Sequence, residues 1–195
     1  MDAEKIHHQV QQRFASVAKN PTCEKRLRLG RSSALELGYD PAVLDTLPQD
    51  AVASFAGVGN PLALAPVTEG MAVLDLGCGA GVDTMIAART VGPKGKVFAI
   101  DMTDEMVEKA RRSCAEAGCD NVEISKSLAN DLALDDASVD VAISNGVVNL
   151  CPDKQGVLRE LFRVLKPGGR MQLADMSLVD EINPELLERV GEWSD

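Results

Sequence analysis

Hydrophobic and polar positions follow two rhythms along this chain, one typical of buried strands and the other of amphipathic helices. Short apolar runs predict five strands, at Met71–Asp75, Lys96–Asp101, Asn121–Ser125, Ser138–Ser144 and Arg170–Ala174. Strands that alternate with helices imply right-handed crossovers and a mostly parallel sheet. The predicted fold class is therefore α/β, with a doubly wound sheet whose ligands lie at the carboxyl ends of the strands.

Between these strands, apolar residues at helical spacing predict helices with recognisable ends. Val82–Val91 precedes the helix-stopping pair Gly92-Pro93, and the next helix starts after Thr103, the expected N-cap, and ends at Gly118. A later helix is expected to end at Pro167-Gly168-Gly169. Its expected buried stripe consists of Val157, Leu158, Leu161, Phe162 and Leu165.

Residues 1–70 precede the alternating pattern and are expected to form a helical and loop extension, with 71–195 as the second domain. Ala3–Lys19 predicts a helix that ends at Asn20-Pro21. Pro41–Leu47 predicts a short helix with Asp40 as its N-cap. The glycine-containing segment 56–61 is a candidate for lying over a ligand. The expected apolar stripe of the helix at Ala3–Lys19 consists of Val10, Phe14, Val17 and Ala18.

Composition narrows the possible partners. With 195 residues, 45% of them hydrophobic, the chain is long enough for a real core. The net charge of −10 and the 3% aromatic content argue against a nucleic-acid partner. No apolar run is long enough for a membrane span, and the first residues lack the apolar core of a signal peptide. A small-molecule substrate and a cytoplasmic location are therefore expected.

The cysteines and histidines form no recognisable metal site. The five cysteines include no Cys-x-x-Cys pair, which together with their odd number fits a reducing compartment. The two histidines, His7 and His8, are neighbours on the N-terminal helix. Adjacent helical residues point apart, so both are expected to be solvated and no metal is expected.

The most informative segment is the glycine loop after the first strand, which reads Val73-Leu-Asp-Leu-Gly-Cys-Gly-Ala-Gly81. The second strand ends in an acid, Asp101, as it does in nucleoside-binding units where a carboxylate binds hydroxyls. A dinucleotide fingerprint needs a glycine at Val82, and Asp75 would repel a pyrophosphate. Because Asp75 suits an ammonium and a sulfonium, the motif favours S-adenosylmethionine (SAM) over NAD.

With these motifs assembled, the chain resembles the class I SAM-dependent methyltransferases from about Met71 to Ala174, and it looks closest to the arsenite methyltransferase family. The resemblance implies a Rossmann-like domain, SAM as the cofactor and methyl transfer as the reaction. Shorter similarities extend to Leu37-Gly-Tyr39, Gly59-Asn-Pro61 and Glu192-Trp193. The carrying segments are Leu74–Asp83, Ile100–Met106, Ile143–Leu150 with Pro152-Asp-Lys154, and Arg163–Gly169.

The resemblance also implies which residues contact SAM. Asp75 and the loop glycines would surround its methionine part, and Asp101 would accept hydrogen bonds from both ribose hydroxyls. Met102 would pack on the adenine, and Asn145 would lie near the methyl group. The expected cofactor-binding set is Asp75, Gly77, Cys78, Gly79, Gly81, Asp101, Met102, Leu128, Ala129 and Asn145.

The chain departs from the resembled family at the arsenic-binding positions. The family binds As(III) through cysteine thiolates, because this soft centre prefers sulfur ligands. Val58 and Gly146 stand where the family has cysteines, and a third would follow directly after Asp195. Cys23 is a loose match to an N-terminal family cysteine. Trivalent arsenic is therefore expected to bind weakly, through at most Cys23 and one other thiol.

Methyl transfer from a sulfonium needs positioning and exclusion of water more than acid–base chemistry. No general base stands out, although Asn145 and Asp175 lie at strand ends, and Cys151 is expected either in the pocket or as a buried core thiol. The candidate catalytic residues are Asn145, Cys151 and Cys23. This pattern favours a small soft acceptor, arsenite or a thiol-bound metalloid. Methylation of an ordinary small metabolite, or a non-catalytic or truncated SAM-binding module, stays open.

The end of the sequence raises a question about the edge of the sheet. The resembled fold continues with further strands after Ala174, whereas this sequence supplies one more expected helix, Pro184–Trp193, and lacks the last strands. An uncovered strand edge favours pairing, so a homo-oligomer through that edge is one expectation and a missing segment is another. A further hypothesis is that the codon after Asp195 is UGA and encodes selenocysteine.

Overall fold

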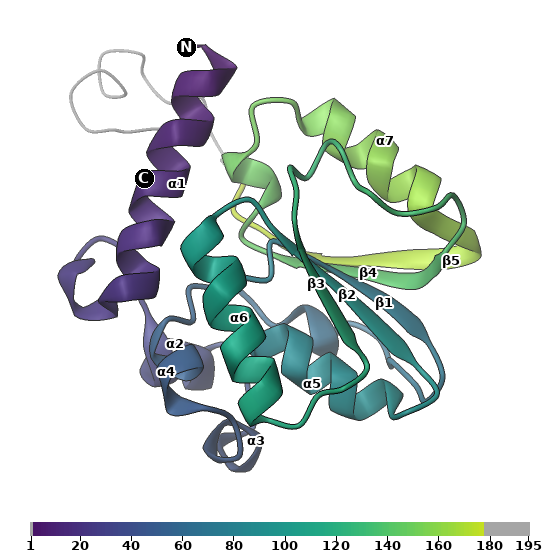
Figure 1. Cartoon of the computed structure of the whole chain (residues 1–195), viewed down its shortest axis with the longest axis horizontal. Coiled ribbons are helices and arrows are strands. Elements are labelled where there is room, and N and C mark those ends of the chain that lie inside the picture. The colour runs from purple at the N-terminus through teal and green to yellow at the C-terminus, as the bar shows by residue number, and fades with distance from the viewer. Residues whose placement is uncertain (1, 178–195) are drawn as a thin grey trace.

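The computed structural model describes residues 2–177, so the helix expected at Pro184–Trp193 lies outside the described part. Within it, the strands pair in parallel in the order β3-β2-β1-β4-β5 (Figure 1). This arrangement confirms the predicted α/β class and the parallel sheet. The strands are β1 (Ala72–Leu76), β2 (Lys96–Asp101), β3 (Val122–Lys126), β4 (Val139–Asn145) and β5 (Leu165–Ala174).

Successive residues of the central strand face opposite helical layers, as the two-residue period of a strand requires. Val73 packs in a buried cluster with helix α5 (Val82–Val91). Leu74 and Leu76 pack instead in the cluster of helix α7 (Lys154–Val164). Helix α6 (Asp104–Glu116) packs against β2 and β3. Helices therefore cover both faces, and the sheet is doubly wound as predicted.

The N-terminal segment packs onto α5 and α6 rather than forming a core of its own. Val17, Leu44 and Phe55 share one buried cluster with Met85 and Met106. Helix α1 lies along α6 (Figure 1). The division at residue 70 stays a prediction. The elements of this segment are α1 (Ala3–Lys19), η1 (Pro21–Cys23), α2 (Gly30–Glu36), α3 (Pro41–Asp45), α4 (Gln49–Ala53) and η2 (Pro61–Ala63).

The Pro167-Gly168-Gly169 segment was expected to end a helix, and this expectation was wrong. Helix α7 already ends at Val164, and β5 begins at Leu165 and runs through the segment. The pairing of β4 with β5 shifts its register between Val139 and Val141. The left-handed backbone of Gly168, with φ 82°, fits this irregular start of an edge strand.

The predicted buried stripe of α7 was also partly wrong. Val157, Leu161 and Val164 are buried, whereas Leu158 is 44% exposed and Phe162 is 83% exposed. The buried residues follow one line of helical neighbours, and each exposed residue is turned by about 100° from that line. Helix α7 therefore contacts the sheet through a narrower face than its sequence indicated.

The outer edge of β5 is the strand edge that the sequence left without a partner. Within residues 2–177, β5 pairs with β4 alone. Association of two chains through this edge stays a prediction. No helix in the same range is long and apolar enough to cross a membrane.

Candidate functional site

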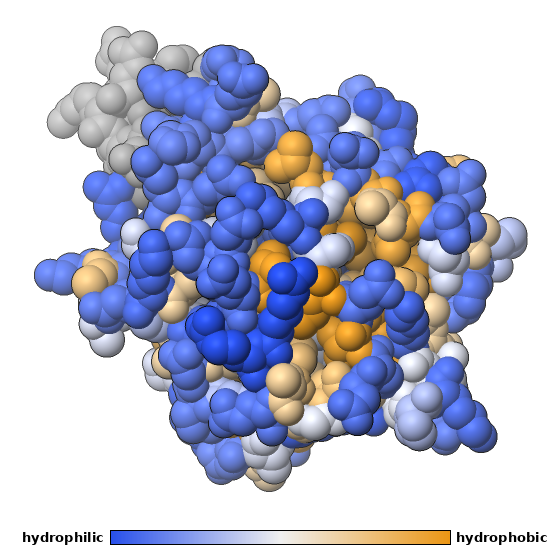
Figure 2. Space-filling view, viewed as in Figure 1, coloured by the Kyte–Doolittle hydropathy of each residue, from blue (hydrophilic) through white to orange (hydrophobic). Residues whose placement is uncertain are grey.

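A cavity lies at the carboxyl ends of the strands, where the predicted ligand site was expected. Figure 2, in the view of Figure 1, shows apolar side chains gathered between α6 and α7, with hydrophilic surface around them. Asp75, Gly81 and Cys23 do not line the cavity. The predicted site residues that do are Gly77, Cys78, Gly79, Asp101, Met102, Leu128, Ala129, Asn145 and Cys151.

The glycine loop closes one side of the cavity because its backbone adopts conformations that other residues avoid. The N–H groups of Gly77 and Cys78 both donate to the Ile100 carbonyl, at 2.7 and 2.9 Å, and so fasten the end of β1 to β2. Gly77 has φ 73°, and a Cβ there would overlap the Val147 side chain. Gly81, with φ 92°, stands behind the loop at the start of α5. It helps to shape the loop without lining the cavity.

Asp101 faces the cavity from the end of β2, and its carboxylate also organises the surrounding backbone. Oδ2 accepts the Gly79 N–H at 3.0 Å, and Oδ1 accepts the Thr103 N–H at 2.8 Å. Thr103 occupies the N-cap position of α6, but its side chain makes no capping bond. The expected N-cap position is therefore confirmed, but the capping bond is absent, and Asp101 accepts the Thr103 N–H instead. Burial raises the pKa of Asp101, and these hydrogen bonds only partly offset the rise.

Asp75 lies just beneath the cavity wall and is almost fully buried. Its Oδ2 accepts the Thr84 hydroxyl at 2.5 Å. Burial, reinforced by the neighbouring Asp83 carboxylate, raises the pKa of Asp75 to about 8. The described partners of Asp75 and Asp101 are neutral hydroxyl and N–H groups. The site therefore gathers carboxyl groups without an internal cation among those partners, and a cationic ligand would favour their ionised form.

Asn145 ends β4 and anchors the segment expected to lie over a ligand. Its Oδ1 accepts the N–H groups of Val58 and Gly59, at 2.8 and 3.1 Å. Its Nδ2 lies 2.8 Å from the Gly59 carbonyl, 3.1 Å from Asp83 Oδ2 and 3.1 Å from Tyr39 Oη. Ala56 and Gly57 line the cavity. The expectation that segment 56–61 borders the ligand site is thus supported by its contacts.

Tyr39 and Asp83 belong to this site, and the sequence analysis assigned neither of them a role. The Tyr39 hydroxyl donates to Asp83 Oδ1 at 2.6 Å, with both side chains buried. Both residues stood in segments that carried the family resemblance. The missing signal is spatial, because the two residues approach each other only after α5 packs onto the N-terminal segment.

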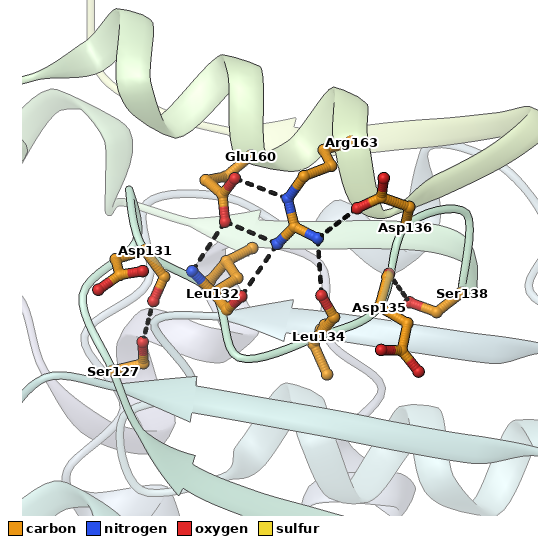
Figure 3. A network of polar contacts seen from close by, with 9 residues as sticks. All are labelled: Ser127, Asp131, Leu132, Leu134, Asp135, Asp136, Ser138, Glu160 and Arg163. Atoms are coloured by element: carbon orange, nitrogen blue, oxygen red, sulfur yellow. Dashed lines mark hydrogen bonds and ion pairs between the residues drawn. The ribbon is translucent and has the colours of Figure 1, made fainter.

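The segment after β3 brings Leu128 and Ala129 to the cavity and is held in place from α7. Figure 3 shows Arg163 donating to the carbonyls of Leu132 and Leu134. Its guanidinium also contacts the carboxylates flanking it on both sides, as the same view shows. This multiple anchoring fixes a connection that contains no helix or strand. The two carboxylates are those of Asp136 and Glu160, each 2.8 Å from a nitrogen of the Arg163 guanidinium.

Helix α1 supplies a wall of the cavity that the sequence analysis did not anticipate. His7, Val10 and Phe14 line the cavity from one face of the helix. The Gln11 side chain fastens α1 to the Met102 carbonyl at 3.1 Å. The expectation that His7 is solvated was therefore wrong, because the approach of α1 to the strand ends leaves this residue half-buried. His8 is exposed, as expected.

The cysteine side chains lie in different environments. Cys151 is half-buried and lines the cavity, and burial raises the pKa of its thiol to about 11. Cys78 is buried in the loop, and burial raises the pKa of its thiol as well. Cys23 is exposed on η1, away from the cavity lining. Within residues 2–177 no group of three acidic, cysteine or histidine side chains could hold a metal ion.

The two positions where the resembled family carries cysteines lie against each other. A Cβ built on Gly146 would stand 3.3 Å from Val58 Cγ1. Gly146 has φ 73°, so any side chain there would also be strained. Asp175 was expected as a pocket candidate, and this expectation was wrong. It is exposed and accepts the Asn149 N–H at 3.1 Å, outside the cavity lining.

Comparison with known proteins gives consistent matches. The "Methyltransferase domain" family model matches residues 67–195. An arsenite methyltransferase of Halobacterium salinarum is 45% identical over 145 residues, which cover 74% of this chain and 37% of that protein. The chain thus spans little more than a third of this curated relative's length.

Two solved structures extend the comparison. The crystal structure of an arsenic (III) S-adenosylmethionine methyltransferase from Chlamydomonas reinhardtii matches with a TM-score of 0.70 and 36% identity, over 77% of this chain and 54% of that one. A SAM dependent methyltransferase from Aquifex aeolicus matches with a TM-score of 0.57 and 31% identity, over 81% of this chain and 80% of that one. Both matches agree with the Rossmann-like architecture.

Proposed function

We propose, from the premise that this chain belongs to the class I SAM-dependent methyltransferases, that it methylates a small soft acceptor of the arsenite or thiol-bound metalloid class. The observation that carries the cofactor part of the proposal is a group of three carboxyl side chains at one end of an apolar cavity, the buried Asp75 and Asp83 and the half-buried Asp101. Burial raises the pKa of all three. A cation bound beside them would relieve the cost of burying their charge.

The residues of the cavity fit SAM, which supplies a methyl group on a positively charged sulfur. Each carboxylate oxygen of Asp101 accepts one well-aligned backbone N–H, from Gly79 and from Thr103. A carboxylate oxygen can accept two hydrogen bonds, so one acceptor site per oxygen remains for the two ribose hydroxyls. A Cβ added to Gly79 would meet nothing within 4 Å, which leaves the loop open toward a ligand.

Apolar residues would hold the adenine. Met102 follows Asp101, and Leu128 and Ala129 come from the segment that Arg163 anchors. Phe14 of α1 lines the same cavity and adds an aromatic surface. These side chains would exclude water from the base by apolar contact.

The acceptor would bind at the end of the cavity formed by Gly57, Asn145, Gly146 and Cys151. With a pKa of about 11, the Cys151 thiol is protonated at neutral pH, so it would have to lose its proton before it could ligate a soft centre. An acceptor that is already nucleophilic needs no general base from the protein. The residues would then act by orienting it and excluding water.

Methylation of an ordinary small metabolite is the second candidate. It is favoured by Val58 and Gly146, which put an apolar contact where the resembled family has thiols. The two candidates are separated by SAM turnover with arsenite and a thiol, measured beside turnover with a panel of small thiols, amines and hydroxylated metabolites. Arsenic methylation above the panel supports the first candidate. Turnover confined to the panel supports the second.

A further inference from the structure

We propose that Tyr39 and Asp83 are positioning residues that act through Asn145. They fix the Asn145 amide so that it holds the backbone of Val58 and Gly59 closed over the acceptor end of the cavity. The proposal rests on the proposed function only for the identity of the molecule that binds at the acceptor end. The contacts that carry it do not depend on the identity of the acceptor.

The orientation of the Asn145 amide follows from which neighbours can donate. The N–H groups of Val58 and Gly59 can only donate, so the atom facing them at 2.8 and 3.1 Å must be the oxygen. A carboxylate can only accept, so the atom facing Asp83 Oδ2 at 3.1 Å must be the nitrogen. A flipped amide would oppose like groups on both sides, and Asp83 therefore selects one orientation.

Tyr39 completes the selection by holding Asp83 in place. Its single hydroxyl proton is directed to Asp83 Oδ1 at 2.6 Å rather than to the Gly59 carbonyl, which is farther away at 3.3 Å. This leaves the Tyr39 oxygen to accept from Asn145 Nδ2 at 3.1 Å. The Tyr39 ring is itself fixed by an edge-on contact with Phe55, with the ring centroids 5.1 Å apart and the planes at 69°. Tyr39 does not line the cavity, so its influence on a ligand must pass through this network.

The backbone of this segment packs tightly against the Asn145 side chain and the end of β5. A Cβ on Gly57 would overlap the Asn145 side chain, and a Cβ on Gly59 would lie 2.6 Å from Ala174 Cβ. The Gly59 carbonyl also lies 2.8 Å from Asn145 Nδ2. Gln172 of β5 holds the later part of the segment, by donating to the Pro61 carbonyl at 2.7 Å. Asn145 holds the Val58 and Gly59 N–H groups at the end of β4, so the orientation of its amide decides whether these two bonds form.

Hydrogen exchange tests this network without any methyl acceptor. In Tyr39→Phe, we expect the Val58 and Gly59 amides to exchange about fivefold faster relative to the amides of β2, and in Asp83→Asn more than tenfold faster. Asp140→Asn is the matched control, because Asp140 is another aspartate that accepts a backbone N–H, from Ala72. The control should leave that ratio unchanged. If Asp83→Asn does not fold, the Tyr39→Phe result decides.

The same variants separate positioning from general loosening. With Tyr39→Phe we expect the acceptor KM to rise about fivefold and the SAM affinity to stay within twofold of the unmodified protein. Exchange of Val58 and Gly59 that is unchanged, or that rises only in step with β2, would overturn the proposal. If no acceptor is methylated, the proposed function fails, but the exchange ratio still decides the role of Tyr39 and Asp83.

Discussion

At the two ends of the sheet, the pKa values of aspartate side chains are shifted in opposite directions. At the amino end of β4, Asp140 accepts the Ala72 N–H at 2.8 Å and pairs with Lys166 Nζ at 2.8 Å. Partial burial alone would raise its pKa, but these contacts lower it overall. At the carboxyl ends, Asp75 and Asp101 meet neutral donors, and burial raises the pKa of both.

This difference distinguishes a structural charge from a charge reserved for a ligand. The charge of an aspartate that forms an ion pair with a lysine is compensated within the fold. Carboxylates that are buried together without one destabilise the ligand-free protein, and this burden is offset only when a cation arrives. The contrast therefore locates the ligand end of the sheet independently of the glycine motif.

The largest expected effect is the loss of SAM binding in Asp101→Ala. The substitution removes the acceptor of both ribose hydroxyls, so we expect binding to weaken by about 2–4 kcal/mol. It also frees the N–H groups of Gly79 and Thr103, so the folded fraction must be measured beside the affinity. Calorimetry that gives an unchanged affinity would remove Asp101 from the cofactor site.

The second effect concerns the acceptor end. Val58→Cys together with Gly146→Cys should raise the affinity for trivalent arsenic by about tenfold or more, because thiolates suit a soft centre. The left-handed Gly146 makes the second substitution strained by about 1–2 kcal/mol, so Val58→Cys alone is the better-folded comparison. Arsenite titration measures the gain. A stable three-thiolate complex in the unmodified chain, seen by X-ray absorption, would contradict the prediction.

The third effect is a change in the pH dependence of stability at Asp75. Its folded pKa, about 8, is higher than the ordinary aspartate value of 3.8, so the folded state binds more protons between these values. The free energy of unfolding should therefore fall as the pH rises from 4 to 8. Asp75→Asn should remove this slope, so that the Tm of the ligand-free variant exceeds that of the unmodified protein at pH 8 by more than it does at pH 5.

Thermal unfolding at pH 5 and pH 8 measures the slope. The same variant should bind SAM more weakly, since it removes a charge beside the expected methionine position. Equal stabilisation at both pH values would mean that Asp75 does not titrate in this range. A pH slope that survives the substitution would assign it to another group.

The smallest effect is expected at the amino end, in Asp140→Asn. The lowered pKa of Asp140 means that its contribution is present above the ordinary value and is lost as the pH falls through the folded pKa. Because the Lys166 side chain is 40% exposed, the loss at pH 7 should be about 1 kcal/mol or less. Denaturant unfolding measures it, and SAM affinity should not change. A larger effect on SAM affinity than on stability would contradict the proposed difference between the two ends of the sheet.

The sequence predicted the regular part of the fold well, because that part depends on local pattern. Ala3–Lys19, Val82–Val91 and Lys96–Asp101 have the bounds expected from their apolar spacing and end signals. The short helices α2 and α4 were missed, since elements of so few residues show little periodicity. At Leu165–Ala174, pairing with β4 overrides the glycine signal for a turn.

Local motifs placed residues at the cavity where strand ends share one edge, and they gave no signal where distant segments meet. The glycine loop and Asp101 reach the cavity because strand ends of a parallel sheet share one edge. The contact between Tyr39 and Asp83 joins residues 44 positions apart, and α1 reaches the cavity from the start of the chain. No local pattern encodes such contacts.

The wall formed by α1 ties ligand binding to the completion of folding. The cavity joins residues of the first helix, such as His7, to residues as late as Asp153. A ligand that binds only this assembled cavity adds stability that grows with the logarithm of its concentration above the dissociation constant. Release of either the first helix or the segment after β4 would forfeit that gain. A saturating cofactor should therefore join the two ends of the described chain into one cooperative unit, and a nascent chain would acquire it only after both ends are in place.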